Sequence, residues 1–165
     1  MKKHTMPIST PLEFPYFRAS VGGVIIGPKG KILSFERADS KGSWQSVQGG
    51  IDPGETPVQA LFREIREEIG LSSKQVTIIA EYPHWLAYEF PPSQMHHKKC
   101  AGQAQRWFLL TLTGSTTDIK LHGNGHKTEF QGWKMTTLRR HAEEVVGFKR
   151  EVYLEFSKYF RKYAR

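Results

Sequence analysis

The pattern of hydrophobic and polar positions first predicts strands. Residues 17–27 ("FRASVGGVIIG") are rich in β-branched and apolar side chains, and a second such run follows the turn at 28–31, which predicts a β-hairpin. Further apolar runs of strand length predict strands at 75–82, 84–90, 104–112 and 129–135. Segments that are polar or rich in Gly and Pro separate them and are expected to be loops at 43–55, 91–102 and 113–128.

A helix is predicted over residues 56–71, because both of its ends carry a signal. Thr56 is a suitable N-cap and Gln59 completes a capping box, while Gly70 suits a left-handed C-terminal stop. The apolar residues of the face expected to be buried recur every fourth position: Leu61, Ile65 and Ile69.

The two ends of the chain differ in character. Helices are predicted from about Thr137 and from about Phe148, and the second carries apolar residues at every fourth position: Phe148, Val152, Phe156 and Phe160. Residues 1–15 are polar and interrupted by prolines, which predicts a loosely ordered N-terminal arm. The expected organisation is one domain over residues 16–165, without an internal repeat.

Composition narrows the class of protein. The chain has 165 residues and a formal net charge of +8, which favours polyanionic partners such as nucleotides or RNA. Cys100 is the single cysteine, so no disulfide framework is expected and the predicted compartment is the cytoplasm. No apolar run has the length of a signal sequence or a membrane span, so no membrane partner is expected. A stable DNA partner is not expected either, and the sequence names no protein partner.

Three acidic residues of the predicted helix share one face. Glu64, Glu67 and Glu68 are spaced i, i+3 and i+4, so their side chains are neighbours. One interpretation is a solvated amphipathic face whose repulsion is softened by Arg63 and Arg66. The other is a site for Mg²⁺ or Mn²⁺, because several hard oxygen ligands beside a glycine-rich loop suit a cation that also binds phosphates.

The spacing of this region decides between the two interpretations. Gly49, Glu55 and the segment 63–71 ("REIREEIGL") match every fixed position of the Nudix box, G-x5-E-x7-R-E-U-x-E-E-x-G-U, over residues 49–71. The chain therefore resembles the Nudix hydrolases. The resemblance implies an α+β fold, an α/β/α sandwich in which a central mixed β-sheet is packed between helices, and it implies an enzyme.

The resemblance extends outside the box. "YFRASVG" (16–22) and "SWQSVQGGI" (43–51) are similar to blocks of one Nudix branch, the bacterial RNA 5'-pyrophosphohydrolases and plant-type diadenosine tetraphosphate hydrolases. Four further blocks of that branch follow in the same order: "HWLAYEFPP" (84–92), "GQAQRWFLL" (102–110), "EFQGW" (129–133) and "VVGFKREVY" (145–153).

The resemblance implies roles for the acidic residues. Glu64, Glu67 and Glu68 would bind Mg²⁺ or Mn²⁺, with more than one ion in the active complex and the backbone carbonyl of Gly49 as a further ligand. Water would attack phosphorus without a covalent enzyme intermediate. Glu129 is expected to bind metal or to act as the general base, and Glu68 is the alternative base. Arg63 and Glu55 are expected to orient the box rather than to touch substrate.

Other matched positions are basic or aromatic and are expected to bind substrate. The residues are Arg18, Arg37, Tyr88, Arg106, Phe148 and Lys149. Each has a plainer alternative, such as a strand-edge charge for Arg37, a strand residue for Tyr88 or a core position for Phe148. Trp44, Trp107 and Trp133 are expected to be core or loop anchors.

One departure from the branch lies just before the box. Ser46 and Val47 stand where the branch has an aromatic residue or Met followed by Pro. Without the fixed φ of proline, this loop is expected to be more flexible or to present its carbonyl at a different angle.

The resulting functional hypothesis is metal-dependent hydrolysis of the 5'-triphosphate end of RNA, with dinucleoside polyphosphates such as diadenosine tetraphosphate as the alternative substrates. A non-catalytic nucleotide- or RNA-binding protein and an enzyme for free NTPs or ADP-ribose are less favoured, the former because a pure binder needs no carboxylate cluster.

Overall fold

The computed structural model describes residues 16–164, so the arm predicted at 1–15 lies outside the described residues. Eight strands were found: β1 (Phe17–Ile26), β2 (Ile32–Arg37), β3 (Trp44–Gln45), β4 (Val47–Gly50), β5 (Val76–Glu81), β6 (Leu86–Glu89), β7 (Gly102–Leu112) and β8 (Phe130–Thr136). The α-helices are α1 (Pro57–Ile69), α2 (Pro92–Lys98), α3 (Leu138–Glu144) and α4 (Arg150–Phe160), with short 3₁₀ turns η1 (Pro28–Gly30), η2 (Thr116–Asp118) and η3 (Gly147–Lys149).

All eight strands belong to one mixed sheet. Its main path runs β3-β2-β1-β7-β5, while β4 pairs with β1, β6 with β7 and β8 with β2. The long central strands β1 and β7 are parallel, in register from Phe17 opposite Gly102 to Ile26 opposite Thr111. The other pairs are antiparallel, including β1 with β2 as the hairpin pattern predicted.

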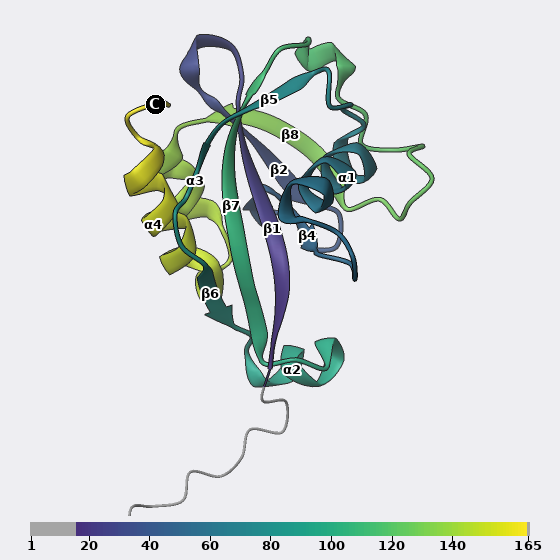
Figure 1. Cartoon of the computed structure of the whole chain (residues 1–165), viewed down its shortest axis with the longest axis vertical. Coiled ribbons are helices and arrows are strands. Elements are labelled where there is room, and N and C mark those ends of the chain that lie inside the picture. Colours follow the sequence, from purple (N-terminus) through teal and green to yellow (C-terminus); the bar gives the residue numbers. More distant parts are fainter. Residues whose placement is uncertain (1–15, 165) are drawn as a thin grey trace, which may run out of the picture.

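Helices cover the two faces of this sheet (Figure 1). Helix α1 lies against one face, and α3 and α4 lie together against the other. The buried side chains accordingly form two clusters, one between the sheet and α1 around Leu61 and Ile65, and one between the sheet and α4 around Trp107 and Phe156. The architecture is the α+β sandwich expected from the resemblance.

Local signals place α1. The Thr56 hydroxyl accepts a hydrogen bond from the Gln59 backbone N–H, the Gln59 side chain accepts one from the Thr56 N–H, and Gly70 ends the helix with φ 71°. The apolar stripe is fully buried at Leu61, Ile65 and Ile69. Because each of these interactions spans only a few residues, the sequence pattern sufficed to predict them.

Two predicted loops contain regular structure. The segment 43–55, expected to be a loop, contributes β3 and β4 to the sheet. The segment 91–102 contains α2, whose first turn starts with Pro92. Both are corrections: β3 and β4 are short strands stabilised by pairing with β2 and β1, and α2 is a helix of seven residues that buries none of them. No helix within residues 16–164 is long and apolar enough to cross a membrane.

Candidate active site

Glu64, Glu67 and Glu68 line a common cavity of about 210 Å³. The other residues that line it come from the loop between β7 and β8: His126, Lys127 and Glu129. We call this the acid cavity. The structure thus brings Glu129 to the three acidic residues of α1, although 61 residues separate Glu68 from Glu129 in sequence.

Glu68 is the most deeply buried member of the acid cavity. Its side chain is only 8% exposed, and its Oε2 has no hydrogen-bond partner among the described residues. Burial, followed by the neighbouring charges of Glu64 and Glu129, raises the pKa of Glu68 well above its ordinary value. A backbone hydrogen bond from Gln48 and the charge of Lys149 oppose this rise. Such a carboxylate is costly to bury unless a cation or a proton compensates it.

Arg63 ties the glycine-rich loop to α1. Its guanidinium donates to both oxygens of Glu55 and to the carbonyl of Gly50, each at 2.8 Å. It also donates to Glu64 at 2.7 Å and approaches Glu67 at 3.4 Å. The Arg63 hydrogen bonds lower the pKa of Glu55 to about 2. Arg63 and Glu55 therefore orient the loop, as predicted, because planar guanidinium and carboxylate groups pair at two points.

Two glycines let the strand β4 approach charged side chains closely. A Cβ atom at Gly49 would lie 2.0 Å from the carboxylate carbon of Glu64. A Cβ atom at Gly50 would lie 2.1 Å from a terminal nitrogen of Arg18. The carboxylate of Glu64 thus fills the space of a missing side chain, and Arg18 also lowers the pKa of Glu64 against the larger raising effect of burial.

The donor set of the acid cavity fits a hard divalent cation. Carboxylate oxygens are the ligands that Mg²⁺ and Mn²⁺ prefer, and the unpartnered Oε2 of Glu68 supplies one that is buried. As the side chains lie here, residues 16–164 contain no group of three acidic, His or Cys side chains closed around a metal position. Glu64 and Glu67 here form ion pairs with Arg63. Glu64 would exchange this contact for a cation.

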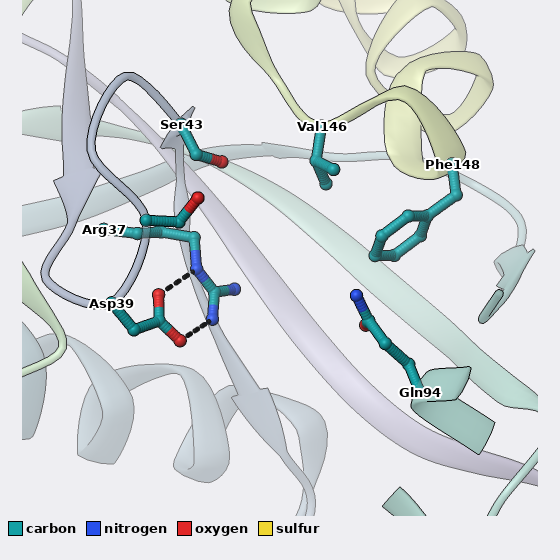
Figure 2. A pocket seen from close by; sticks show the side chains of 7 residues that line it. Arg37, Asp39, Ser43, Gln94, Val146 and Phe148 are labelled. Atoms are coloured by element: carbon teal, nitrogen blue, oxygen red, sulfur yellow. Dashed lines mark hydrogen bonds and ion pairs between the residues drawn. The ribbon is translucent and has the colours of Figure 1, made fainter. Parts of the chain in front are cut away.

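A second cavity, of about 160 Å³, lies beside Phe148. The residues that line it are Arg37, Asp39, Ser40, Ser43, Gln94, Val146 and Phe148, and we call it the Phe148 pocket. Figure 2 shows the Phe148 ring and the amide of Gln94 facing the guanidinium of Arg37 across the pocket. Asp39 accepts two hydrogen bonds from that guanidinium, at 2.8 and 2.7 Å, and these lower the pKa of Asp39.

Lys149 interacts electrostatically with residues of both cavities, Glu68 of the acid cavity and Arg37 of the Phe148 pocket. Its side chain is buried, and its Nζ donates to Oε1 of Gln45 at 3.1 Å and lies 5.6 Å from the centre of the Tyr88 ring. Burial is the main cause that lowers the pKa of Lys149 to about 7, and the charges of Arg37 and Lys98 add to it. Glu68 acts in the opposite direction. A buried ammonium group held by a single amide oxygen is well suited to take up a phosphate oxygen.

Tyr88 joins the Phe148 pocket to a row of amide side chains. Its hydroxyl donates to Gln103 at 2.9 Å, and its ring packs against Phe148 with centroids 5.6 Å apart. Gln105 in turn donates to Gln103 at 3.3 Å and to Gln48 at 3.5 Å. This row ends at Gln48, whose backbone hydrogen-bonds Glu68, so hydrogen bonds connect Tyr88 to the acid cavity.

Of the residues predicted to bind substrate, Arg37 and Phe148 line one of the two cavities, whereas Arg106 lines neither. It hydrogen-bonds Glu81 and lies over the ring of Trp85 at 5.5 Å. Of the tryptophans expected to be anchors, Trp107 is fully buried, whereas Trp133 is 36% exposed. The Nζ of Lys134 lies 4.1 Å from the centre of the Trp44 ring.

Sequence reasoning missed several residues that line the two cavities. His126 and Lys127 reach the acid cavity from a segment expected to be only a polar loop, and Nε2 of His126 lies 3.5 Å from Glu67. Asp39 and Gln94 line the Phe148 pocket, and Gln45 joins Lys149 to Arg37. His126, Lys127, Asp39 and Gln94 belong to none of the blocks that the sequence analysis compared, so their spacing carried no signal. Gln45 lies in the block 43–51 but was given no role there.

Known proteins resemble this chain in sequence and in fold. The model of the NUDIX domain matches residues 16–156. An RNA pyrophosphohydrolase of Ruthia magnifica is 44% identical over 86% of this chain and 80% of its own. The chloroplastic Nudix hydrolase 26 of Arabidopsis thaliana is 42% identical over 84% of this chain and 67% of its own. Among solved structures, the E. coli dihydroneopterin triphosphate pyrophosphohydrolase superposes with a TM-score of 0.69 at 23% identity, over 87% of this chain and 98% of that one, a likeness of fold.

Proposed function

The chain belongs to the Nudix family, and on that premise we propose that it hydrolyses a phosphoanhydride bond in the 5'-triphosphate end of RNA. The relatives called RNA pyrophosphohydrolase cover most of both chains, which supports this substrate class. Family members act as hydrolases on phosphoanhydride bonds with the help of divalent metal ions. We propose Mg²⁺ or Mn²⁺, more than one ion in the active complex, and the cytoplasm as the place of action.

The observation that carries the proposal is the pairing of the two cavities through Lys149. The acid cavity offers oxygen ligands and a buried carboxylate, Glu68, whose Oε2 has no hydrogen-bond partner among the described residues. The Phe148 pocket offers a flat ring opposite a guanidinium, which suits a nucleobase near the 5' end. Lys149 interacts electrostatically with Glu68 and lies 5.9 Å from the centre of the Phe148 ring. A triphosphate bridging the cavities would pass this ammonium group.

The roles of the acidic residues follow from their positions. Glu64, Glu67 and Glu68 would hold the cations, with the Gly49 carbonyl as a further ligand, and Glu129 lines the same cavity from the segment before β8. Divalent cations supply positive charge that neutralises the phosphates and acidifies water. Arg63 keeps α1 and the glycine-rich loop in fixed relation while this happens.

Proton removal falls to a carboxylate of the acid cavity. Glu68 has a raised pKa because it is buried next to Glu64 and Glu129, so it would hold a proton more readily than an exposed acid. Glu129 lies near enough to exert its charge on Glu68 and remains the alternative base. The attacking water would lose its proton to one of them, and the phosphate product would leave without a covalent intermediate.

Arg18, Arg37 and Lys149 would bind the remaining phosphates. Arg37 lines the Phe148 pocket but is held by Asp39, so a substrate phosphate would compete with that carboxylate. Arg18 reaches the strand β4 beside the acid cavity, where its charge acts on Glu64. Arginine suits such contacts because its planar fork matches phosphate oxygens.

A substrate panel tests the proposal. We expect release of phosphate or pyrophosphate from 5'-triphosphorylated RNA in the presence of Mg²⁺ or Mn²⁺, with a higher kcat/KM than for diadenosine tetraphosphate, NTPs or ADP-ribose. A large preference for diadenosine tetraphosphate would replace RNA by dinucleoside polyphosphates as the substrate class. Inactivity on the whole panel, equal in the wild type and Glu68→Gln, would overturn the enzymatic function.

A further inference from the structure

Ser46 lies where the chain changes its partner strand. Strand β3 ends at Gln45 and pairs with β2, whereas β4 begins at Val47 and pairs with β1, so Ser46 is the single residue between the two ladders. Its side chain is fully buried. A buried backbone N–H outside a ladder requires another partner, and so does a buried hydroxyl.

Side chains of the α3–α4 layer supply both partners. The Ser46 N–H donates to the hydroxyl of Tyr153 at 3.0 Å. The Ser46 Oγ lies 2.7 Å from Nε2 of His141, and the other ring nitrogen, Nδ1, lies 2.9 Å from Oγ of Ser34 on β2. We call the latter arrangement the Ser34–His141–Ser46 bridge. It connects α3 to β2 and to the start of β4.

The imidazole of the bridge is held neutral and fixed in orientation. Complete burial lowers the pKa of His141 to about 3. A neutral imidazole has one donor and one acceptor nitrogen, so one serine donates to it and the other accepts from it. The rings of His141 and Tyr153 also pack together, with centroids 5.0 Å apart. Ser46 is therefore anchored through three groups from two helices and a neighbouring strand.

The position of Ser46 is important for the acid cavity because β4, which follows it, packs against α1 and its acidic residues. Two residues beyond Ser46, the backbone of Gln48 hydrogen-bonds Glu68. The next residue, Gly49, lies so close to the Glu64 carboxylate that a Cβ there would overlap it. A small displacement of β4 would thus change the surroundings of both carboxylates, since this part of the structure is tightly packed.

We propose that the Ser34–His141–Ser46 bridge is a positioning element for the metal-binding carboxylates, which sets the place of β4 relative to α1. The inference rests on the proposed function, because it concerns the cations expected in the acid cavity. Ser46 and Val47 occupy the positions where the branch that the sequence resembles has an aromatic residue or Met followed by Pro. A proline fixes φ through its ring; here a buried hydroxyl and an imidazole fix the same segment through tertiary contacts.

The loop expected to be flexible is accordingly buried. Ser46 and Val47 are both 0% exposed. Val47 pairs with Gly23 of β1 and belongs to the apolar cluster under α1. Packing and hydrogen bonds thus hold this segment without a proline.

A measurement of metal affinity distinguishes a positioning role of Ser46 from a general contribution of Ser46 to the stability of the fold. Mn²⁺ alone would be titrated into the full-length wild type and the Ser46→Ala variant, with free Mn²⁺ followed by electron paramagnetic resonance. We expect Ser46→Ala to raise the Kd for Mn²⁺ roughly tenfold, the effect typical of losing a group that orients a metal ligand. The matched control is Ser157→Ala, which removes another buried hydroxyl of the α3–α4 layer, one that donates to the carbonyl of Leu138.

The control and a second variant make each outcome decisive. Ser157→Ala should lower Tm and leave the Kd for Mn²⁺ within about twofold of the wild type. Equal Kd values for the Ser46→Ala and Ser157→Ala variants would overturn the positioning role. Should Ser46→Ala fail to fold, Ser34→Ala removes only the far end of the bridge, and a Kd no different from that of Ser157→Ala would overturn the inference. No Mn²⁺ binding by the wild type would overturn the proposed function itself, and this inference with it.

Discussion

The acid cavity takes three of its carboxylates from a single stretch of α1, whereas the Phe148 pocket takes its seven lining residues from three segments far apart in sequence, at 37–43, 94 and 146–148. In the acid cavity, the helix itself sets the relative positions of Glu64, Glu67 and Glu68, and Arg63 on the same helix fixes the adjoining loop. In the Phe148 pocket, the relative positions of the lining residues depend on how α2 and η3 lie relative to the end of β2.

The two sites also treat charge differently. Glu68 is buried, and its Oε2 has no hydrogen-bond partner among the described residues, so the acid cavity contains a carboxyl group that needs a proton or a cation to compensate its charge. In the Phe148 pocket, Arg37 forms an ion pair with Asp39. The nearby ammonium group of Lys149 is buried and donates to an uncharged amide, that of Gln45. From this difference we expect that a single substitution in the acid cavity strongly weakens cation binding. In the Phe148 pocket, several residues contribute to substrate binding, so we expect a single substitution to have a smaller effect. Four substitutions test this contrast.

Glu68→Gln should have the largest effect. Because the amide cannot take up a proton or bind a cation as a carboxylate does, we expect kcat on triphosphorylated RNA to fall about 1,000-fold. With EDTA present, Tm should not fall, since the substitution removes a buried charge near Glu64 and Glu129. Steady-state kinetics and thermal melts measure both, and Glu151→Gln on the exposed side of α4 is the control. A loss of activity below tenfold would contradict the special role of the acid cavity.

Lys149→Met tests the buried ammonium group through the pH dependence of stability. Burial lowers the pKa of Lys149 to about 7 in the folded protein, from an ordinary pKa of 10.5. Between these two pH values the unfolded chain therefore binds more protons than the folded protein. The free energy of unfolding of the wild type therefore increases as the pH rises from about 7 to 10.5. Below about pH 7, the folded protein bears the full cost of burying the charged ammonium group.

The variant lacks this contribution. Relative to the wild type, Lys149→Met should be more stabilising near pH 6 than near pH 9, by about 1–3 kcal/mol in the free energy of unfolding. Urea denaturation at the two pH values measures the difference. The exposed Lys158 provides the control, since Lys158→Met should give a pH-independent difference. An equal effect of Lys149→Met at both values would mean that Lys149 is not desolvated as the structure indicates.

Phe148→Ala should affect binding rather than chemistry. Loss of a stacking surface for a base is expected to raise KM for triphosphorylated RNA about tenfold and to change kcat little. Phe148→Trp, which keeps an aromatic face, should stay close to the wild type in KM. A fall in kcat without a change in KM would show that Phe148 supports the acid cavity and not a substrate base.

Arg106→Gln should have the smallest effect. Because Arg106 pairs with Glu81 and lies over Trp85, outside both cavities, we expect kcat/KM to change less than about threefold, the range of an exposed ion pair. The comparison is Arg37→Gln. Because Arg37 lines the Phe148 pocket, this substitution should raise KM more than Arg106→Gln does. A larger loss for Arg106→Gln than for Arg37→Gln would restore the substrate role that the sequence comparison predicted for Arg106.

The sequence by itself determined α1, most strands and the three carboxylates that α1 contributes to the acid cavity. The capping box of Thr56 and Gln59, the left-handed Gly70 and the spacing of the glutamates all act over a few residues, so their pattern can be read along the chain. The strands β1, β2 and β7 were predicted for a similar reason, because an apolar run of strand length can be recognised in the sequence without knowing which strand it pairs with.

Only the tertiary structure decided the remaining features. β3 and β4 are too short to show a period, and they exist because β2 and β1 offer ladders to join. The lining of the Phe148 pocket and the anchoring of Ser46 likewise depend on distant partners: His141 is separated by 107 residues from Ser34 and by 95 from Ser46. A local pattern specifies which face of an element is buried, but which polar groups meet inside the protein depends on how the elements pack.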